Sequence, residues 1–232
     1  MATAVAIRAK IIEKTDNPCR SSGRPRAFLD EARAELPVAR CVTTSRAGGR
    51  GCSLIRYEAD ILGRGLDVIF CGLNPAASAV GAGHNFSNRS NRFWTVLHLA
   101  GFTDVRLQPQ DERRLLEYGC GITAVVGRPT KRVDEVLSEE FRKARVGFET
   151  KIRRYAPRSI AFLGKRALST MIGQPDVEWG QHARGFAGTM AWVLPNPSGL
   201  NRSFSLDALV AAYSEFRTAL LGSSAKRMPK SL

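Results

Sequence analysis

Two Asn-Pro dipeptides, each directly after an apolar run, are the residues of this sequence most suited to chemistry. Asn74 follows the run 66–73, and Asn196 follows the run 190–194. A carboxamide can hold a water molecule or a base edge by hydrogen bonds, but it cannot act as a strong general base. A single Asn-Pro is more typical of a turn, whereas two of them beyond two strands form an unusual constellation.

Four short apolar runs predict the strands that position these residues: 66–73, 121–126, 159–163 and 190–194. The segments between and after them have helical spacing: a helix capped by Ser90, a helix over 139–155, and a helix over 205–221 that Gly222 ends. Strands alternating with helices predict an α/β fold with a parallel sheet between helical layers. Ligands bind beyond the carboxyl ends of such strands, so we expect the site in the loops after Leu73, Val126, Leu163 and Leu194.

Glycines in the first loop raise the alternative of a nucleotide- or phosphate-binding protein. Gly81 and Gly83 suggest a phosphate-cradling loop, but the dinucleotide fingerprint requires a third glycine where Phe86 stands. The Gly164-Lys165 pair lacks the upstream glycine of a Walker loop. This alternative also leaves the loop 194–202 unexplained, and binding of free nucleotide rather than duplex DNA would discriminate it.

Composition favours a polyanionic partner. The formal net charge is +14 at pH 7 and the pI is about 10.3, which raises affinity for nucleic acid without specifying sequence. No apolar run approaches the roughly 20 residues that span a bilayer, and the N-terminus lacks the charge order of a secretory signal. We therefore expect a cytoplasmic protein. The five cysteines form no C-x-x-C pair, which argues against a zinc site, an iron–sulfur cluster or a disulfide scaffold.

The chain divides into three predicted segments. Residues 1–60 form a basic, flexible extension, in which 1–56 hold 11 Lys and Arg against 5 Asp and Glu, with one short helix near 28–36. Residues 61–222 form the single folded domain, and 223–232 form a basic tail. The extension either adds electrostatic affinity for DNA or has no function, and both alternatives are open.

The order of several motifs carries a family resemblance. G-L-N-P with a downstream phenylalanine is followed by S-N-R-F-W, G-I-T-A-V-V-G-R-P-T, L-G-K and L-P-N-P-S-G-L-N-R. This pattern, over about two-thirds of the chain, resembles the bacterial mismatch-specific uracil-DNA glycosylases, which are relatives of animal thymine-DNA glycosylase. The resemblance implies a three-layer α/β/α sandwich with a short, mainly parallel central sheet. It implies neither a metal nor an organic cofactor.

The resemblance also implies an activity. Members flip a nucleotide out of the duplex, because the sugar–base bond is not accessible within the stack. We expect removal of uracil, with thymine or ethenocytosine as further substrates, from G·U-type mismatches in double-stranded DNA. No lysine is obviously placed for a Schiff base, so we expect a monofunctional enzyme that leaves an intact abasic strand. We further expect a monomer, associated with the nucleoid. A non-catalytic binder of damaged DNA is the second alternative.

The residues of the first loop take their roles from the resemblance. Asn74 is expected to position the attacking water against a cationic sugar, after the glycosidic bond has largely broken. Phe86 is expected to stack on the flipped base, and Leu73, Ala79 and Asn196 to border the base pocket. Ala79 stands where the bacterial pattern has serine and the animal enzyme has alanine, which leaves room for a thymine methyl group.

The second loop matches the DNA wedge of the family. Leu200 is expected to fill the space of the flipped nucleotide, while backbone groups around Gly199 and Asn201 contact the orphaned guanine. Arg202 is expected to bind a flanking phosphate or help fill the gap. The predicted phosphate contacts are His84, Arg89 and Lys165, with Arg92, Lys131, Arg132 and Arg166 as further candidates. For each cation, a solvated surface charge is the alternative.

Overall fold

The computed structural model describes residues 57–225. The predictions for the basic extension, its helix over 28–36 and residues Cys19, Cys41 and Cys52 lie outside the described residues, as do 226–232. The predicted domain boundaries after 60 and 222 therefore stay predictions.

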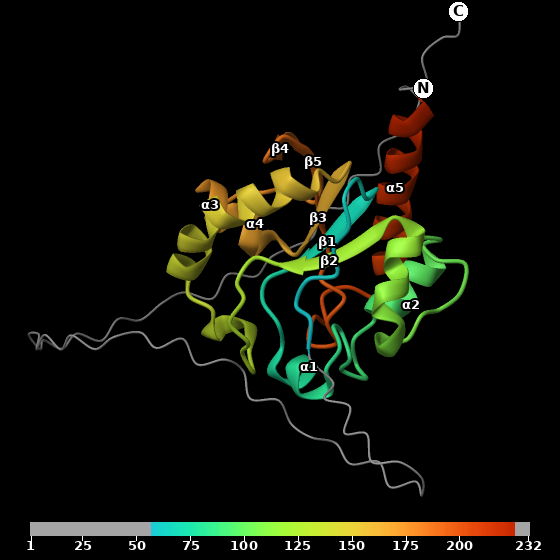
Figure 1. Cartoon of the computed structure of the whole chain (residues 1–232), viewed down its shortest axis with the longest axis horizontal. Coiled ribbons are helices and arrows are strands. Elements are labelled where there is room, and N and C mark those ends of the chain that lie inside the picture. The colour runs from blue at the N-terminus through green and yellow to red at the C-terminus, as the bar shows by residue number, and fades with distance from the viewer. Residues whose placement is uncertain (1–56, 226–232) are drawn as a thin grey trace, which may run out of the picture. The chain divides into compact units, whose positions relative to one another are not determined.

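Five strands form one sheet in the order β2-β1-β3-β5-β4 (Figure 1). They are β1 (Val68–Gly72), β2 (Cys120–Ala124), β3 (Ser159–Leu163), β4 (Gly180–Phe186) and β5 (Thr189–Leu194). The first three and β5 run parallel, whereas β4 is antiparallel to β5. Gly72 pairs with Ala124, and Leu163 with Leu194, so the parallel strands end along one edge of the sheet.

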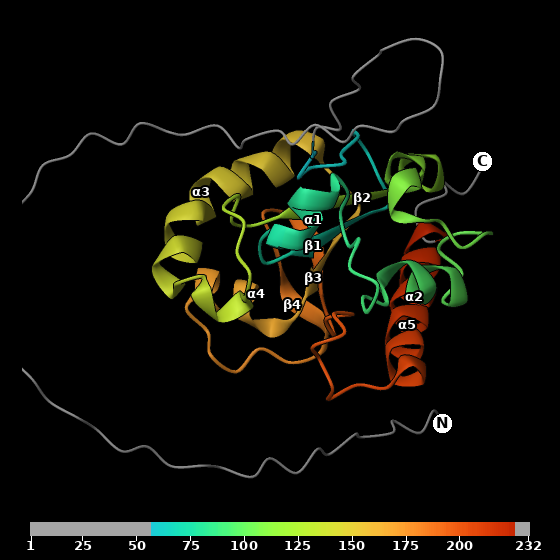
Figure 2. The ribbon, with the colours of Figure 1, turned by 90° about the horizontal axis from the view of Figure 1, so that it is seen from below.

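Helices cover both faces of this sheet, as the two views show (Figures 1 and 2). One face carries α2 (Phe93–Leu99), α5 (Leu206–Ala225) and the 3₁₀ segment η1 (Pro109–Tyr118), and the other carries α3 (Ser138–Tyr155) and α4 (Lys165–Ile172). The short α1 (Ala77–Ala82) and η2 (Val133–Glu135) lie in the connections after β1 and β2. The predicted three-layer sandwich with a mainly parallel sheet is confirmed.

Side-chain alternation along the strands produces the two cores. In β1, Val68 and Phe70 pack toward α2 and α5, while Ile69 and Cys71 pack toward α3 and α4. All four are buried, which is why the strand is a continuous apolar run rather than an alternating one. Cys71 and Cys120 are free thiols, one in each core, and burial raises the pKa of both, that of Cys120 to about 12. None of the helices described is both long and apolar enough to cross a bilayer.

Two local predictions were wrong, and one strand was missed. Ser90 does not cap α2, because Asn91 Oδ1 accepts the hydrogen bond of the Phe93 N–H group at 3.0 Å. Gly222 does not end α5, which continues to Ala225. The strand β4 was not predicted, since it is a sheet edge with mostly partly or fully exposed residues, and His182 lies within it.

Candidate active site

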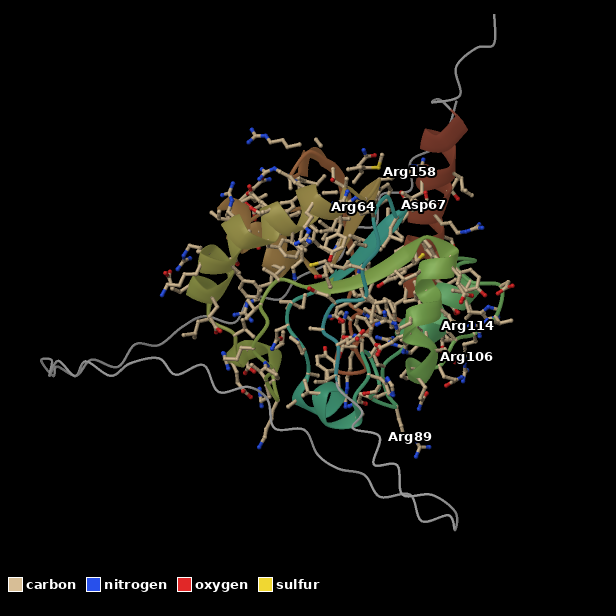
Figure 3. The ribbon with its side chains drawn as sticks, in the orientation of Figure 1. Arg64, Asp67, Arg89, Arg106, Arg114 and Arg158 are labelled. Atoms are coloured by element: carbon tan, nitrogen blue, oxygen red, sulfur yellow. The ribbon has the colours of Figure 1, made fainter. Side chains whose placement is uncertain are left out.

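A pocket of about 170 Å³ opens at the carboxyl ends of the parallel strands. The loops after β1, β2 and β5 meet there with the end of β3, as the strand order requires. Figure 3 shows Arg89 at this end of the molecule and the Asp67–Arg158 ion pair at the opposite end of the sheet. The predicted site residues among its lining are Leu73, Asn74, Ala79, Phe86, Asn196 and Leu200, together with the further phosphate-contact candidates Lys131 and Arg132.

The side chain of Asn74 is held in one orientation. Its Nδ2 donates to the Arg128 carbonyl at 2.9 Å, to Thr130 Oγ1 at 2.9 Å and to the Pro75 carbonyl at 3.2 Å. A carbonyl oxygen can only accept, so the atom that faces Arg128 must be the amide nitrogen. No described residue donates to Asn74 Oδ1, which is therefore available as a hydrogen-bond acceptor in the pocket.

Thr130, which was not among the residues predicted for the site, holds the side chain of Asn74. It is buried, and its hydroxyl accepts from Asn74 while donating to the Arg132 carbonyl at 2.7 Å. Its backbone also clamps the first loop, since its N–H bonds the Pro75 carbonyl and its carbonyl accepts from the Ala77 N–H. The sequence does contain one signal for Thr130, because this residue ends the polar G-R-P-T motif beyond a predicted strand.

Asn196 complements Asn74. Its Oδ1 accepts from the Ser198 N–H at 2.9 Å, which identifies that atom as the carbonyl oxygen. Its amide NH₂ donates to none of the described groups and the residue lines the pocket. The pocket therefore combines one carboxamide with a free acceptor and one with free donors.

Phe86 occupies a strained backbone conformation. Its φ of 52° lies in the left-handed region, which costs a non-glycine residue about 1–2 kcal/mol. The ring stacks on Phe93 with centroids 3.9 Å apart and an interplanar angle of 21°. One ring face is thus supported by the core, while the residue remains half-buried and lines the pocket. A supported aromatic face of this kind suits the stacking of a planar base.

A buried carboxylate holds the strained segment in place. Glu112, only 5% exposed, accepts from the Asn85 backbone N–H at 2.8 Å and from Asn85 Nδ2 at 2.9 Å. Asn85 Oδ1 accepts from the Tyr57 hydroxyl at 2.7 Å, and burial, together with the negative charges of Glu112 and Asp60, raises the tyrosine pKa. His84 Nδ1 lies 3.2 Å from Glu112, so a phosphate contact by His84 would use Nε2. Nothing in the sequence pattern distinguishes Glu112 from a surface acid.

The wedge loop, residues 197–204, projects a leucine into solvent. The Leu200 residue is 84% exposed. Gly199 packs so closely on Ser90 that an added Cβ would lie 2.4 Å from its side chain and 2.5 Å from its carbonyl oxygen. The sequence predicts a close approach of the backbone at Gly199. In the structure, this backbone lies close to a neighbouring loop of the protein, at Ser90. The N–H, carbonyl and side chain of Asn201 all bond within the domain.

Arg92 holds the wedge loop in place through its guanidinium group. Its guanidinium donates to the carbonyls of four loop residues, at 2.7–3.4 Å: Pro197, Ser198, Asn201 and Phe204. Its backbone N–H also donates to the Pro197 carbonyl at 3.0 Å. The planar fork of arginine can bridge several acceptors at once, which the single ammonium of lysine cannot do in the same way.

The other basic candidates separate into two groups. Arg132 pairs with Asp134, and Arg166 donates to the carbonyls of Val133 and Val136. In contrast, Arg89, Lys131, Lys165 and Arg202 have no carboxylate partner among residues 57–225, so their charges are available to an anion. The assignments of Arg89, Lys165 and Arg202 to phosphate contacts stay predictions.

The fold and the site define an α/β/α protein with a polar, aromatic-lined pocket beside a projecting leucine. The sequence model described as "Uracil DNA glycosylase superfamily" matches residues 60–219, which is more than half of the chain. The protein belongs to this superfamily, and its membership supports a hydrolase of the DNA-glycosylase class that acts in DNA repair. A solution NMR structure from Methanosarcina acetivorans, described as a "putative Uracil DNA glycosylase", is similar with 18% identity and a TM-score of 0.46 over 70% of this chain and 98% of that chain.

Proposed function

We propose that this protein removes uracil from G·U mismatches in double-stranded DNA and leaves an abasic site. The observation that carries the proposal is the oriented carboxamide of Asn74, whose free Oδ1 lies in a pocket of base-binding character. The projecting Leu200 supports the use of a duplex substrate, because an apolar wedge can replace the stacking that is lost when a nucleotide leaves the helix.

The chemistry that fits this site is a dissociative displacement. An amide oxygen holds water by accepting a hydrogen bond, but it does not remove a proton efficiently. The glycosidic bond breaks first, the oxygen of the water held by Asn74 then adds to the cationic sugar, and the proton that this water loses passes to the departed base anion or to solvent. The base leaves as an anion, and the free NH₂ of Asn196 and the unbonded backbone N–H groups of Phe86 and Ser87 are candidate donors to its carbonyl oxygens.

Specificity and product follow from the same pocket. Ala79 is buried in the pocket wall, and its small side chain leaves room for a thymine methyl group, so thymine and ethenocytosine are proposed further substrates. Lys131 is the one lysine that lines the described pocket, and it is exposed. We propose that it neutralises phosphate and forms no Schiff base with the sugar, which makes the enzyme monofunctional.

Base release from labelled duplexes tests these proposals. Duplexes with G·U, A·U or G·T and single-stranded DNA with uracil are incubated with the full chain, and alkali then cleaves the abasic sites. We expect release from G·U well above A·U, and the G·T lane measures the contribution of the Ala79 position. Strand cleavage without alkali would contradict the monofunctional assignment and implicate Lys131. Binding without release from any substrate would indicate a non-catalytic damage binder.

Replacing Thr130 should slow chemistry without weakening DNA binding. Thr130→Val keeps the shape of the side chain but removes the hydroxyl that accepts from Asn74. The loss of one hydrogen bond of about 1 kcal/mol corresponds to about a fivefold lower single-turnover rate. Thr130→Ser retains the hydroxyl and should react within about twofold of the natural protein. Equal rates for the valine and serine variants would show that the hydroxyl does not position Asn74.

Variants of Arg92 and Arg89 should have different effects, because we assign Arg92 to the positioning of the wedge loop and Arg89 to phosphate binding. Arg92→Gln removes most of the hydrogen bonds to the wedge loop, so we expect about tenfold slower base release and a free energy of unfolding lower by about 1–3 kcal/mol. Arg89→Gln, at an exposed residue, should instead weaken binding and reduce the salt dependence of the dissociation constant. Single-turnover rates and binding titrations at several salt concentrations distinguish the two. Identical behaviour of the variants would contradict this division of roles.

A further inference from the structure

An exposed tryptophan lies beside the wedge loop. Trp179 is 43% exposed, whereas the two other tryptophans of the chain, Trp94 and Trp192, are 6% and 4% exposed. Its ring contacts the edge of Phe204 with centroids 5.4 Å apart and an interplanar angle of 81°. The ammonium of Lys165 lies over the same indole, 4.9 Å from its centroid. We call Trp179, Phe204 and Lys165 the aromatic platform.

Topology places the platform at the site edge. The strand β4 is antiparallel to β5 and begins where β5 ends, since Gly180 pairs with Val193. Trp179, immediately before Gly180, therefore lies near the carboxyl ends of the parallel strands. Lys165 begins α4 directly beyond β3, and Phe204 ends the wedge loop, where its carbonyl accepts from Arg92 at 2.7 Å. Three separate connections thus meet at the platform, one of which is the wedge loop that carries Leu200.

The charges at the platform favour an anionic partner. Lys165 has no carboxylate within ion-pair distance in the described part of the chain, and its cation–π contact fixes the ammonium without neutralising it. The exposed Arg202, two residues before Phe204, likewise has no described acidic partner. An indole supplies a flat apolar surface next to these cations. A nucleotide matches this combination, because a phosphate can meet the cations while its sugar or base packs on the ring.

We propose that the aromatic platform binds one nucleotide of the duplex next to the flipped one. Lys165 contacts its phosphate, and the indole of Trp179 packs on its sugar or base. This inference rests on the proposed DNA substrate, and it adds a contact surface outside the pocket. The platform holds the DNA strand beside the wedge loop. The duplex is therefore already aligned with the protein when Leu200 enters it.

Tryptophan fluorescence of the full chain tests the proposal without requiring base release. The probe is a duplex with a tetrahydrofuran abasic analogue opposite guanine, which cannot be hydrolysed. Because the other two tryptophans are buried, quenching by acrylamide reports mainly on Trp179. We expect DNA to protect this fluorescence and the Trp179→Phe variant to lose the protected signal. Unchanged acrylamide quenching with bound DNA would overturn the proposal.

Binding titrations supply a second readout. Trp179→Ala should raise the dissociation constant for this duplex at least fivefold, and Trp179→Phe should restore part of the affinity. Lys165→Gln should reduce the slope of log affinity against log salt concentration by about 1. Val146→Ala, which truncates a residue 74% exposed on α3, is the matched control and should bind like the natural protein. Equal affinity of Trp179→Ala and Val146→Ala would refute the platform.

The two proposals can fail independently. If the G·U duplex is not cut but Trp179 is protected by the abasic duplex, the platform stands and the catalytic assignment falls. If base release proceeds and Trp179 stays accessible, the platform falls and the catalytic assignment stands.

Discussion

Asn74→Ala should reduce single-turnover release of uracil from a G·U duplex by at least about 10²-fold, because no described residue replaces the amide oxygen to which we assign the positioning of water. Binding of the uncleaved duplex should change little, since Asn74 lies in the pocket and carries no charge. Gel-based kinetics with excess enzyme measure the first quantity, and fluorescence anisotropy measures the second. A rate within threefold of the natural protein would contradict the assigned role.

Asn74→Asp provides the control for charge. One carboxylate oxygen would replace the amide nitrogen, 2.9 Å from the Arg128 carbonyl and 3.2 Å from the Pro75 carbonyl, which both accept hydrogen bonds. This repulsion would turn the side chain or keep it protonated, so we expect no gain in rate at neutral pH. A faster Asn74→Asp variant would indicate that general-base catalysis, and not positioning, limits the reaction.

The sequence predicts the parts of this fold whose causes are local. Strands buried on both faces are uninterrupted apolar runs, so β3 matches the predicted run 159–163 and the other three predicted strands match within a few residues. The edge strand β4 is not buried on both faces. With one side of the strand unpaired and most residues partly or fully exposed, its sequence Gly-Gln-His-Ala-Arg-Gly-Phe carries no strand pattern.

The candidate site likewise contains residues whose positions the sequence predicts and residues whose roles depend on contacts distant in the chain. The positions of Asn74 and Asn196 follow from strand ends and topology, and they meet in one pocket. The role of Arg92 depends on carbonyls 105 to 112 residues away in the chain, which no local pattern reveals. Its charge suggested a phosphate contact, whereas geometry commits its guanidinium to the wedge loop. Glu112 is similar, because its burial behind Asn85 depends on how η1 packs against the first loop.

Gly199→Ala should be the second most damaging single change at the site. The new Cβ would meet Ser90 at 2.4 Å from its Cβ and Oγ and at 2.5 Å from its carbonyl oxygen. Because the carbonyl belongs to the backbone, no rotation of a side chain can relieve all of the overlap. The wedge loop must shift, and a displacement of about 1 Å at a positioning element can cost about 10²-fold in rate. Single-turnover base release from the G·U duplex measures this effect.

Two further variants decide whether steric contact with Ser90 is the cause. Ser90→Gly removes the Cβ and hydroxyl but leaves the carbonyl, so the double variant with Gly199→Ala should recover only part of the lost rate. Gly147→Ala, in α3 with no atom within 4 Å of the added Cβ, should stabilise the helix by about 1 kcal/mol and leave base release unchanged. Additive effects of the Ser90 and Gly199 changes would show that the wedge loop does not depend on this contact. Coupling between them would establish that the loop which presents Leu200 is held by close packing of residue 199 against Ser90.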